Sequence, residues 1–98
     1  MKRRVEIHEL AARELNEAIQ YYELECPGLG AAFLDEIERC LDRVADHPEA
    51  GPALAGPVRR RLLRRFPYAL LYKANPDGIR VLAVMNLRRR PTYWVDRA

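Results

Sequence analysis

The sequence predicts an α+β fold in which a two-helix antiparallel hairpin packs on one face of a mainly antiparallel sheet, in the order β-α-α-β-β-β. Three observations predict it. Apolar residues recur at helical spacing in two stretches of the first half, three strand-like runs fill the second half, and short turn sequences join neighbouring elements. A chain of 98 residues forms one core, so we expect a single domain over residues 1–98.

A short β-prone stretch at residues 3–7 opens the chain, and the first helix is expected from about residue 8 to residue 25. Pro27 and Gly28 end that helix, because proline lacks an amide donor and disfavours helical geometry in the residue before it. The apolar residues of the first helix fall on one stripe, at spacings typical of an amphipathic helix: Ala11, Leu15, Ala18, Ile19 and Tyr22.

The second helix follows the turn and is expected to end near His47 and Pro48. Its apolar stripe consists of Phe33, Ile37, Cys40, Leu41 and Val44. Two amphipathic helices joined by a short turn form an antiparallel hairpin. We interpret the many acidic residues of both helices as charge patterning on solvated faces.

Residues 48–57 are rich in Pro, Gly and Ala and predict a loop, after which strands are expected at residues 58–64, 68–74 and 79–86. The stretch Asn75-Pro76-Asp77-Gly78 is a strong turn signal between the last two strands. Short connections make these strands antiparallel neighbours. The run at 79–86 is almost continuously apolar, which is typical of a strand shielded on both faces.

Composition limits the possible functions. The chain is 49% hydrophobic and 32% charged, as in ordinary globular domains, and no apolar run approaches the roughly 20 residues that a membrane span needs. The first residues lack the apolar segment of a signal peptide, so we expect a cytoplasmic protein.

His8 and His47 show no metal-ligand spacing and no phosphate-binding glycine motif occurs, so we expect no metal and no cofactor. Cys26 and Cys40 are expected to pack as free thiols.

Charge is divided unevenly between the halves of the chain. Residues 1–50 carry six Lys/Arg and twelve Asp/Glu, a net of −6, whereas residues 51–98 carry eleven Lys/Arg and two Asp, a net of +9. Ten of those eleven are arginines, whose forks grip phosphate or carboxylate in a bidentate way. Strand alternation divides residues 58–65 between two faces, and we expect the face away from the helices to present several guanidiniums. Such a field attracts nucleic acid or an acidic protein segment, unless the acidic half neutralises it.

Several stretches together resemble the RelE/ParE toxin superfamily of bacterial type II toxin–antitoxin modules. They are AARELNEAIQYYE, PGLGAAFLDEI, DHPEAGP, RRFPYALLY and AVMNLRRRPTYW, which cover nearly the whole chain in the expected order. The resemblance implies a curved sheet and a cognate antitoxin that lays an acidic segment over the toxin. It also implies one of two activities: a RelE-like branch cuts mRNA on the ribosome without a metal, and a ParE-like branch poisons DNA gyrase.

Many relatives carry a histidine before an RR-x-P-x-YW ending, and in this sequence that slot holds Asn86. If the chain is a nuclease, the resemblance and the charge pattern assign catalysis to Arg61, Arg65 and Arg88, which would stabilise phosphate charge, and to Tyr93 as a proton donor. Asn86 cannot titrate and a tyrosine is a poor base at neutral pH. The remaining candidates are assigned to target or antitoxin binding: Arg59, Arg60, Arg64, Arg89, Arg90 and Trp94.

We therefore expect a toxin that forms a hetero-oligomer with an acidic antitoxin and inhibits DNA gyrase. A ribosome-dependent mRNA endoribonuclease is the alternative, so whether the chain is an enzyme stays open. A non-toxic relative that only binds the antitoxin is a third reading. Tyr93 and Trp94 are expected to fold back beside the arginines.

Overall fold

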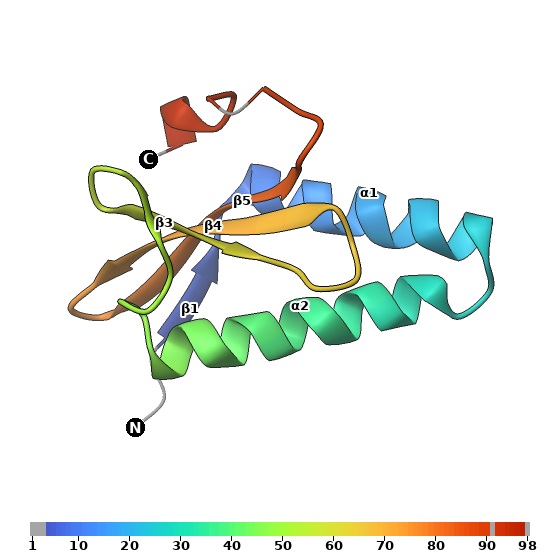
Figure 1. The fold of residues 1–98 in the computed structure, drawn as a ribbon, viewed down its shortest axis with the longest axis horizontal. Coiled ribbons are helices and arrows are strands. Elements are labelled where there is room, and N and C mark those ends of the chain that lie inside the picture. Colours follow the sequence, from blue (N-terminus) through green and yellow to red (C-terminus); the bar gives the residue numbers. More distant parts are fainter. Residues whose placement is uncertain (1–3, 91, 98) are drawn as a thin grey trace.

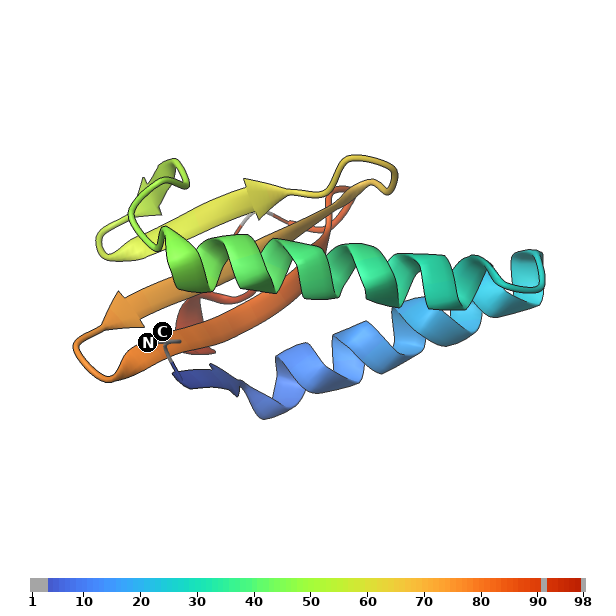
Figure 2. The same cartoon turned by 90° about the horizontal axis from the view of Figure 1, so that it is seen from below.

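The structure is a computed structural model that describes residues 4–90 and 92–97. Both helices lie on one face of the sheet, and the C-terminal segment crosses the other face (Figures 1 and 2). This arrangement confirms the α+β prediction; Arg3, the predicted start of the first strand, lies outside the described residues. The elements are β1 (Arg4–Ile7), α1 (Glu9–Glu25), α2 (Leu29–Asp46), β2 (Ala53–Ala55), β3 (Val58–Leu62), β4 (Tyr68–Asn75), β5 (Gly78–Asn86) and the 3-10 helix η1 (Val95–Arg97).

The sheet has five strands in the order β1-β5-β4-β3-β2. β3, β4 and β5 form the predicted antiparallel meander, and β1 pairs with β5 in parallel. Gly78 permits that parallel pairing, because a Cβ there would overlap the carbonyl oxygen of Arg4. The predicted turn before it is held by Asn75 Oδ1, which accepts from the backbone N–H of Asp77 (3.1 Å) and of Gly78 (2.8 Å).

The predicted loop at residues 48–57 is wrong for three residues. Ala53–Ala55 form β2, which pairs antiparallel with β3 at the edge of the sheet. Gly56 follows with a φ of 55°, in the left-handed region that glycine adopts without strain. β2 is exposed along its whole length, so it has no alternation of apolar and polar residues that a sequence pattern would detect.

The helix hairpin is fixed by an acidic side chain that the sequence pattern assigned to solvent. Glu23 accepts hydrogen bonds from the backbone N–H of Gly28 (3.0 and 3.1 Å) and of Gly30 (3.1 Å). These donors belong to the start of α2, where backbone N–H groups have no partner within the helix. Gly28, at φ 90°, makes the left-handed turn between the helices. Glu23 is therefore a structural residue of the hairpin, a correction to its interpretation as solvated.

Glu36 is a second correction, because its side chain is only 4% exposed. Its carboxylate accepts from the backbone N–H of Arg64 and of Arg65 (3.1 Å to the latter). The sequence pattern placed the end of β3 at Arg64, but the strand ends at Leu62. Beyond that point the backbone leaves the sheet, because the N–H groups of Arg64 and Arg65 donate to Glu36 of α2 and not to a neighbouring strand. Glu36 thus ties α2 to the connection between β3 and β4.

The core lies on both faces of the sheet. On the helix face, the predicted stripe residues Phe33, Ile37 and Cys40 are buried against β4 and β5. On the opposite face, an apolar cluster is closed by Trp94: Val58, Ala69, Leu71, Leu82, Ala83, Met85 and Trp94. We expected several guanidiniums on this second face. Arg60 lies there, and the C-terminal segment covers the apolar side chains beside it.

A bulge lets β5 contribute two successive residues to that second cluster. The pairing of β4 with β5 runs from Leu71↔Ala83 to Tyr72↔Val81, so Leu82 has no partner across the ladder. Both Leu82 and Ala83 consequently belong to the cluster under Trp94. The predicted shielding of β5 on both faces is confirmed.

The two cysteines are both free, as expected. Cys40 is buried in the core, whereas Cys26 is exposed in the turn between the helices and does not pack as expected. Neither helix among the described residues is long and apolar enough to cross a membrane.

Candidate binding site at the end of the last strand

A pocket of about 390 Å³ lies between α1 and the turn that follows β5. Arginines and tyrosines that are distant in sequence share its wall: Tyr21, Tyr22, Tyr68, Arg88, Arg89 and Tyr93. Tyr22 anchors the wall to the core, since its ring centroid lies 4.8 Å from that of Phe66 and 6.1 Å from that of Tyr68. The pocket therefore combines flat aromatic surfaces with guanidinium groups at its rim.

Asn86, which fills the slot of the usual histidine, shapes this pocket through its amide group. Its Oδ1 accepts from the backbone N–H of Arg88 (2.9 Å), and its Nδ2 lies 3.5 Å from the hydroxyl of Tyr68. The backbone N–H of Arg89 donates to the carbonyl oxygen of Asn86 (3.0 Å). Asn86 thus sets the turn that carries the arginines, and its side chain offers no proton for transfer.

Tyr93 lies between two guanidiniums. The Arg89 Cζ is 4.7 Å and the Arg97 Cζ is 4.9 Å from its ring centroid, distances typical of cation–π contacts. Burial, a hydrogen bond with Glu14 and the charge of that carboxylate raise the pKa of Tyr93 well above its ordinary value. A phenol is protonated at neutral pH even without this shift, so the effect of the shift is to make Tyr93 a weaker acid.

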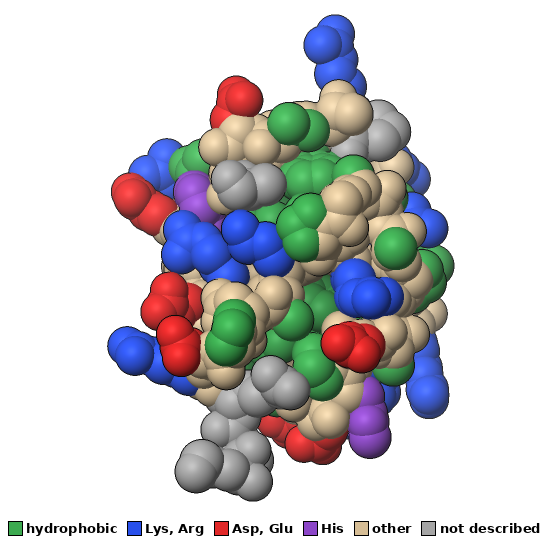
Figure 3. Space-filling view, turned by 90° about the vertical axis from the view of Figure 1, so that its left-hand side faces the viewer, with side chains coloured by type: hydrophobic (Ala, Val, Ile, Leu, Met, Phe, Trp, Pro, Cys, Tyr) green, Lys and Arg blue, Asp and Glu red, His purple; other side chains and the backbone are tan. Residues whose placement is uncertain are grey.

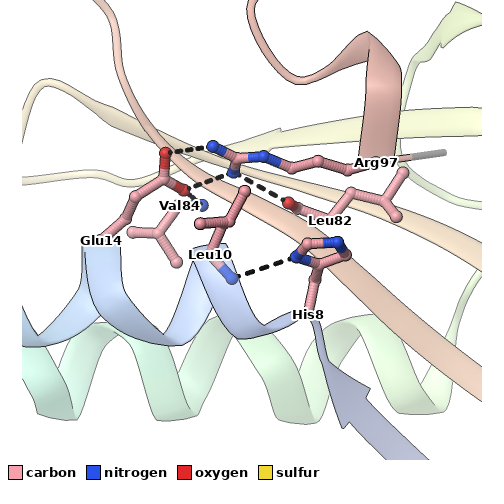
Figure 4. Close-up of polar contacts among 6 residues, drawn as sticks. All are labelled: His8, Leu10, Glu14, Leu82, Val84 and Arg97. Atoms are coloured by element: carbon pink, nitrogen blue, oxygen red, sulfur yellow. Dashed lines mark hydrogen bonds and ion pairs between the residues drawn. The ribbon is translucent and has the colours of Figure 1, made fainter.

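Glu14 and Arg97 join α1 to the C-terminal segment (Figure 4). Arg97 Nη1 donates to Glu14 Oε1 (2.9 Å) and Arg97 Nη2 donates to Glu14 Oε2 (3.1 Å), while Nη1 also reaches the carbonyl oxygen of Leu82 (3.1 Å). Glu14 Oε1 additionally accepts from the backbone N–H of Val84 (3.1 Å). Sequence reasoning missed this pair: Arg97 was not singled out, and Glu14 was assigned to solvent, which is a further correction.

The three arginines of β3 lie on different faces of the sheet. Arg59 and Arg61 pair with Tyr72 and Leu70 and share the helix face with them, whereas Arg60 lies on the opposite face. Arg59 Nη1 donates to the carbonyl oxygen of Gly51 (2.8 Å), which holds the loop before β2. None of the three lines the pocket at the end of β5.

Arg64 and Arg65 are exposed at the connection between β3 and β4, with the guanidinium of Arg65 5.6 Å from the ring centroid of Phe66. Arg90 is exposed in the turn after β5. Trp94 is 3% exposed, so its indole lies in the core rather than on a binding surface. The expected folding back of the C-terminal aromatics is confirmed.

Of the residues assigned to catalysis, the structure brings Arg88 and Tyr93 into one pocket and leaves Arg61 and Arg65 outside it. Glu17 also lines this pocket, so carboxylate and guanidinium groups meet there. Among residues 4–90 and 92–97, no group of three or more His, Cys, Asp or Glu side chains is arranged to hold a metal. The arrangement suits recognition of a flat or charged group better than proton transfer.

Positive charge is distributed in separate groups rather than in one patch on the face that Figure 3 displays. Lys and Arg side chains there alternate with Asp, Glu and hydrophobic side chains. Acidic and basic side chains therefore lie interspersed on that face.

The profile of one protein family, described as the ParE toxin of type II toxin-antitoxin system, parDE, matches residues 5–91. Ten chains of solved structures match significantly. One of them, described as the chromosomal ParDE TA system from P. aeruginosa, has a TM-score of 0.75 and 17% sequence identity, covering 87% of this chain and 96% of that chain. At that identity the match concerns the fold. The comparison with curated proteins found no significant match.

Proposed function

The chain belongs to the ParE toxin family of type II toxin–antitoxin systems, and we propose that it is a ParE-like inhibitor of DNA gyrase that a cognate antitoxin neutralises. Gyrase acts on chromosomal DNA, so the proposal sets the encounter in the cytoplasm. The chain needs no cofactor and no membrane for this action. It binds its target and blocks the catalytic cycle of another enzyme.

The observation that carries this choice is the chemistry of the pocket after β5. Metal-free RNA cleavage needs one group that takes a proton and another that gives one. Asn86 has no titratable group, and burial together with Glu14 raises the pKa of Tyr93, which makes its phenol a weaker proton donor than an ordinary tyrosine. Glu14 is itself engaged by Arg97 at 2.9 Å. These residues favour binding over hydrolysis.

The proposed antitoxin contact uses the exposed arginines. Arg64 and Arg65 at one connection, and Arg88, Arg89 and Arg90 at another, are exposed and have no described carboxylate within ion-pairing distance. An acidic antitoxin segment would satisfy these groups. The affinity should then fall steeply between low and physiological salt, because exposed charges are screened over about 8–10 Å. A Kd that is insensitive to salt would instead favour an apolar contact through the helix hairpin.

A second candidate, a RelE-like mRNA endoribonuclease, is favoured by the tyrosines that line the pocket beside Arg88 and Arg89. Aromatic rings stack on nucleobases, and arginines contact phosphate groups. In this reading Arg88 binds phosphate and Tyr93 approaches the leaving oxygen, while Arg61 and Arg65 would act from outside the pocket.

One pair of assays separates the candidates. The purified chain is added to gyrase in a supercoiling and DNA-cleavage assay, and to ribosomes carrying mRNA in a toeprinting assay. We expect supercoiling to stop and double-strand breaks to accumulate while the mRNA stays intact. Codon-aligned mRNA cuts that disappear in Arg88→Ala but persist in Arg13→Ala would overturn the gyrase proposal. If induced expression without an antitoxin leaves growth unchanged, the chain is a non-toxic binding relative.

A further inference from the structure

Basic side chains from four neighbouring strands form a band across the sheet, on the face opposite the two helices. Lys73 of β4 pairs directly with Arg80 of β5, and Arg80 pairs in turn with Glu6 of β1. Leu71 and Leu82, which stand two residues away on the same two strands, belong to the apolar cluster of that face. Because alternate residues of a strand share a face, the side chains of Lys73 and Arg80 lie there too.

Arg60 and Arg4 extend the band on either side. Arg60 of β3 pairs with Leu71, two residues before Lys73, and Arg4 stands two residues before Glu6 on β1. Both steps run in the same direction along the sheet, because β4 is antiparallel to β3 and β5, and β1 is parallel to β5. Neighbouring strands lie about 4.8 Å apart and alternate residues about 6.8 Å apart, so successive cations are about 5–8 Å from one another. Their order across the sheet is Arg60, Lys73, Arg80 and Arg4.

One carboxylate is shared by two guanidiniums of this band. Glu6 lies 3.4 Å from Arg80 Nη1 and 4.0 Å from Arg4 Nε. The side chains of Arg4 and Arg80 are 80% and 39% exposed, and both line a pocket of about 370 Å³, so a ligand can reach them. Among the residues that the structure describes, neither Arg60 nor Lys73 forms an ion pair. The band therefore keeps an excess of positive charge.

The direct pairing of Lys73 with Arg80 places two like charges opposite each other, which is unfavourable in a sheet. Two exposed carboxylates stand in adjoining segments, Asp77 in the turn before β5 and Asp96 in η1. Within residues 4–90 and 92–97, neither of them is within ion-pairing distance of a cation. An anionic partner from outside would offset the repulsion that the chain itself leaves in place.

We propose that this band binds the phosphate backbone of duplex DNA. Guanidinium and ammonium groups are the usual donors to phosphate oxygens. Duplex DNA carries one phosphate per about 3.4 Å of axis on each strand, so cations about 5–8 Å apart can each reach a separate phosphate of one duplex. The inference goes beyond the proposed action on gyrase and does not rest on it, because it concerns the chain by itself.

The surroundings favour a duplex over an acidic protein segment or a single strand. β3, β4 and β5 each have a hydrogen-bonded strand on both sides, so an extended peptide cannot join the sheet at the centre of the band. Val58, the apolar residue opposite Lys73, is only 2% exposed and offers no anchor for a protein partner. The band consists of arginine and lysine without an aromatic ring, and binding of single strands relies on stacking against such rings.

The test measures the fluorescence anisotropy of a short labelled DNA duplex during titration with the isolated chain, without gyrase. We expect binding at low salt, and a Kd that rises with salt at a log–log slope of about −3, as for about three phosphate contacts. Lys73→Gln and Arg60→Gln should each weaken binding several-fold and make the slope shallower by about 1. Arg39→Gln is the matched control, because it removes one exposed positive charge from α2, on the other side of the sheet, and should leave the Kd unchanged.

Thermal unfolding separates a binding role from a structural one. Lys73→Gln removes one of two facing like charges, so its melting temperature should equal or exceed that of the wild type while its affinity for DNA falls. A lowered melting temperature together with unchanged DNA binding would assign Lys73 to the fold and overturn the proposal.

Other outcomes would also overturn it. The duplex could fail to bind, or Arg39→Gln could weaken binding as much as Lys73→Gln, as for attraction to net charge alone. A duplex RNA of the same sequence that binds more tightly would identify RNA as the ligand, and a polyglutamate peptide that displaces the DNA at lower concentration would identify an acidic protein. DNA binding by a chain that leaves gyrase active would contradict the proposed function and support this inference, whereas inhibition of gyrase by a chain that binds no DNA would do the reverse.

Discussion

Replacing Arg97 with methionine is expected to destabilise the protein strongly, because it leaves the carboxylate of Glu14 without its cation. The pair is nearly buried: the side chains of Arg97 and Glu14 are 10% and 18% exposed, and the shortest N–O distance is 2.9 Å. Methionine keeps much of the length and apolar volume of the arginine stem. The perturbation is therefore mainly the loss of charge and of donors to Glu14 and to the Leu82 carbonyl oxygen.

The magnitude follows from the geometry. At that separation and an effective dielectric constant of 20, the Coulomb attraction is about 6 kcal/mol, and desolvation of each ion offsets several kcal/mol of it. The intact pair thus contributes little net stability. Removal of one member leaves the other charge unpaired, which should lower the free energy of unfolding by about 3–5 kcal/mol. Glu14→Gln added to Arg97→Met removes that charge and retains an acceptor for the Val84 N–H. The double variant should therefore recover about 2 kcal/mol relative to Arg97→Met alone.

Urea unfolding monitored by the fluorescence of Trp94 measures these differences, since this lone tryptophan lies in the segment that Arg97 holds. A loss of 3 kcal/mol lowers the urea midpoint by about 1–3 M. Arg13→Met, an exposed change on α1, should stay within about 0.5 kcal/mol. The reasoning is refuted if Arg97→Met matches that control, or if the double variant is less stable than Arg97→Met.

Three further predictions concern the core, the sheet edge and pH. Ile37 is 2% exposed, so Ile37→Ala should lower the free energy of unfolding by about 2–5 kcal/mol in urea denaturation; an unchanged midpoint would contradict its burial. Gly78→Ala should loosen β1 from β5, because the new Cβ meets the Arg4 carbonyl oxygen, and amide exchange of β1 should accelerate while that of β4 stays slow. The raised pKa of Tyr93 favours the protonated phenol in the folded state, so that stabilisation is complete below the unfolded value of 10.0 and is lost as the pH rises above it. Tyr93→Phe should accordingly show a shallower loss of stability above pH 10 than the wild type, and parallel curves would contradict the shift.

The helices were predictable because their apolar stripes repeat over several turns. The helix hairpin and the antiparallel meander of β3, β4 and β5 were predictable because the connections between their elements are short. The inward-facing carboxylates of Glu14 and Glu36 were not predicted, although a signal existed. Glu14 stands three residues after Ala11 and four before Ala18, on the same helical stripe. Glu36 has the same relation to Phe33 and Cys40. An acidic residue within an apolar stripe indicates a buried acceptor, which a simple division into wet and dry faces overlooks.

The candidate site was less predictable than the fold, because it depends on contacts between distant segments. The arginines and aromatics after β5 were identified as a group, and Arg88, Arg89 and Tyr93 do meet in the pocket. The opposite orientations of Arg60 and Arg61 follow from strand alternation, but which face the helices cover is decided by packing. The burial of Trp94 likewise depends on the bulge at Leu82, for which no local sequence signal exists.

The parallel pairing of β1 with β5 has a consequence for biosynthesis. β1 finds its partner only when residues 78–86 emerge from the ribosome, after both helices and the strands β2, β3 and β4. Such contacts between distant segments make folding slower than in proteins with local contacts. The pocket after β5 cannot exist on a partly synthesised chain, so any binding activity of this domain begins only after its translation is nearly complete.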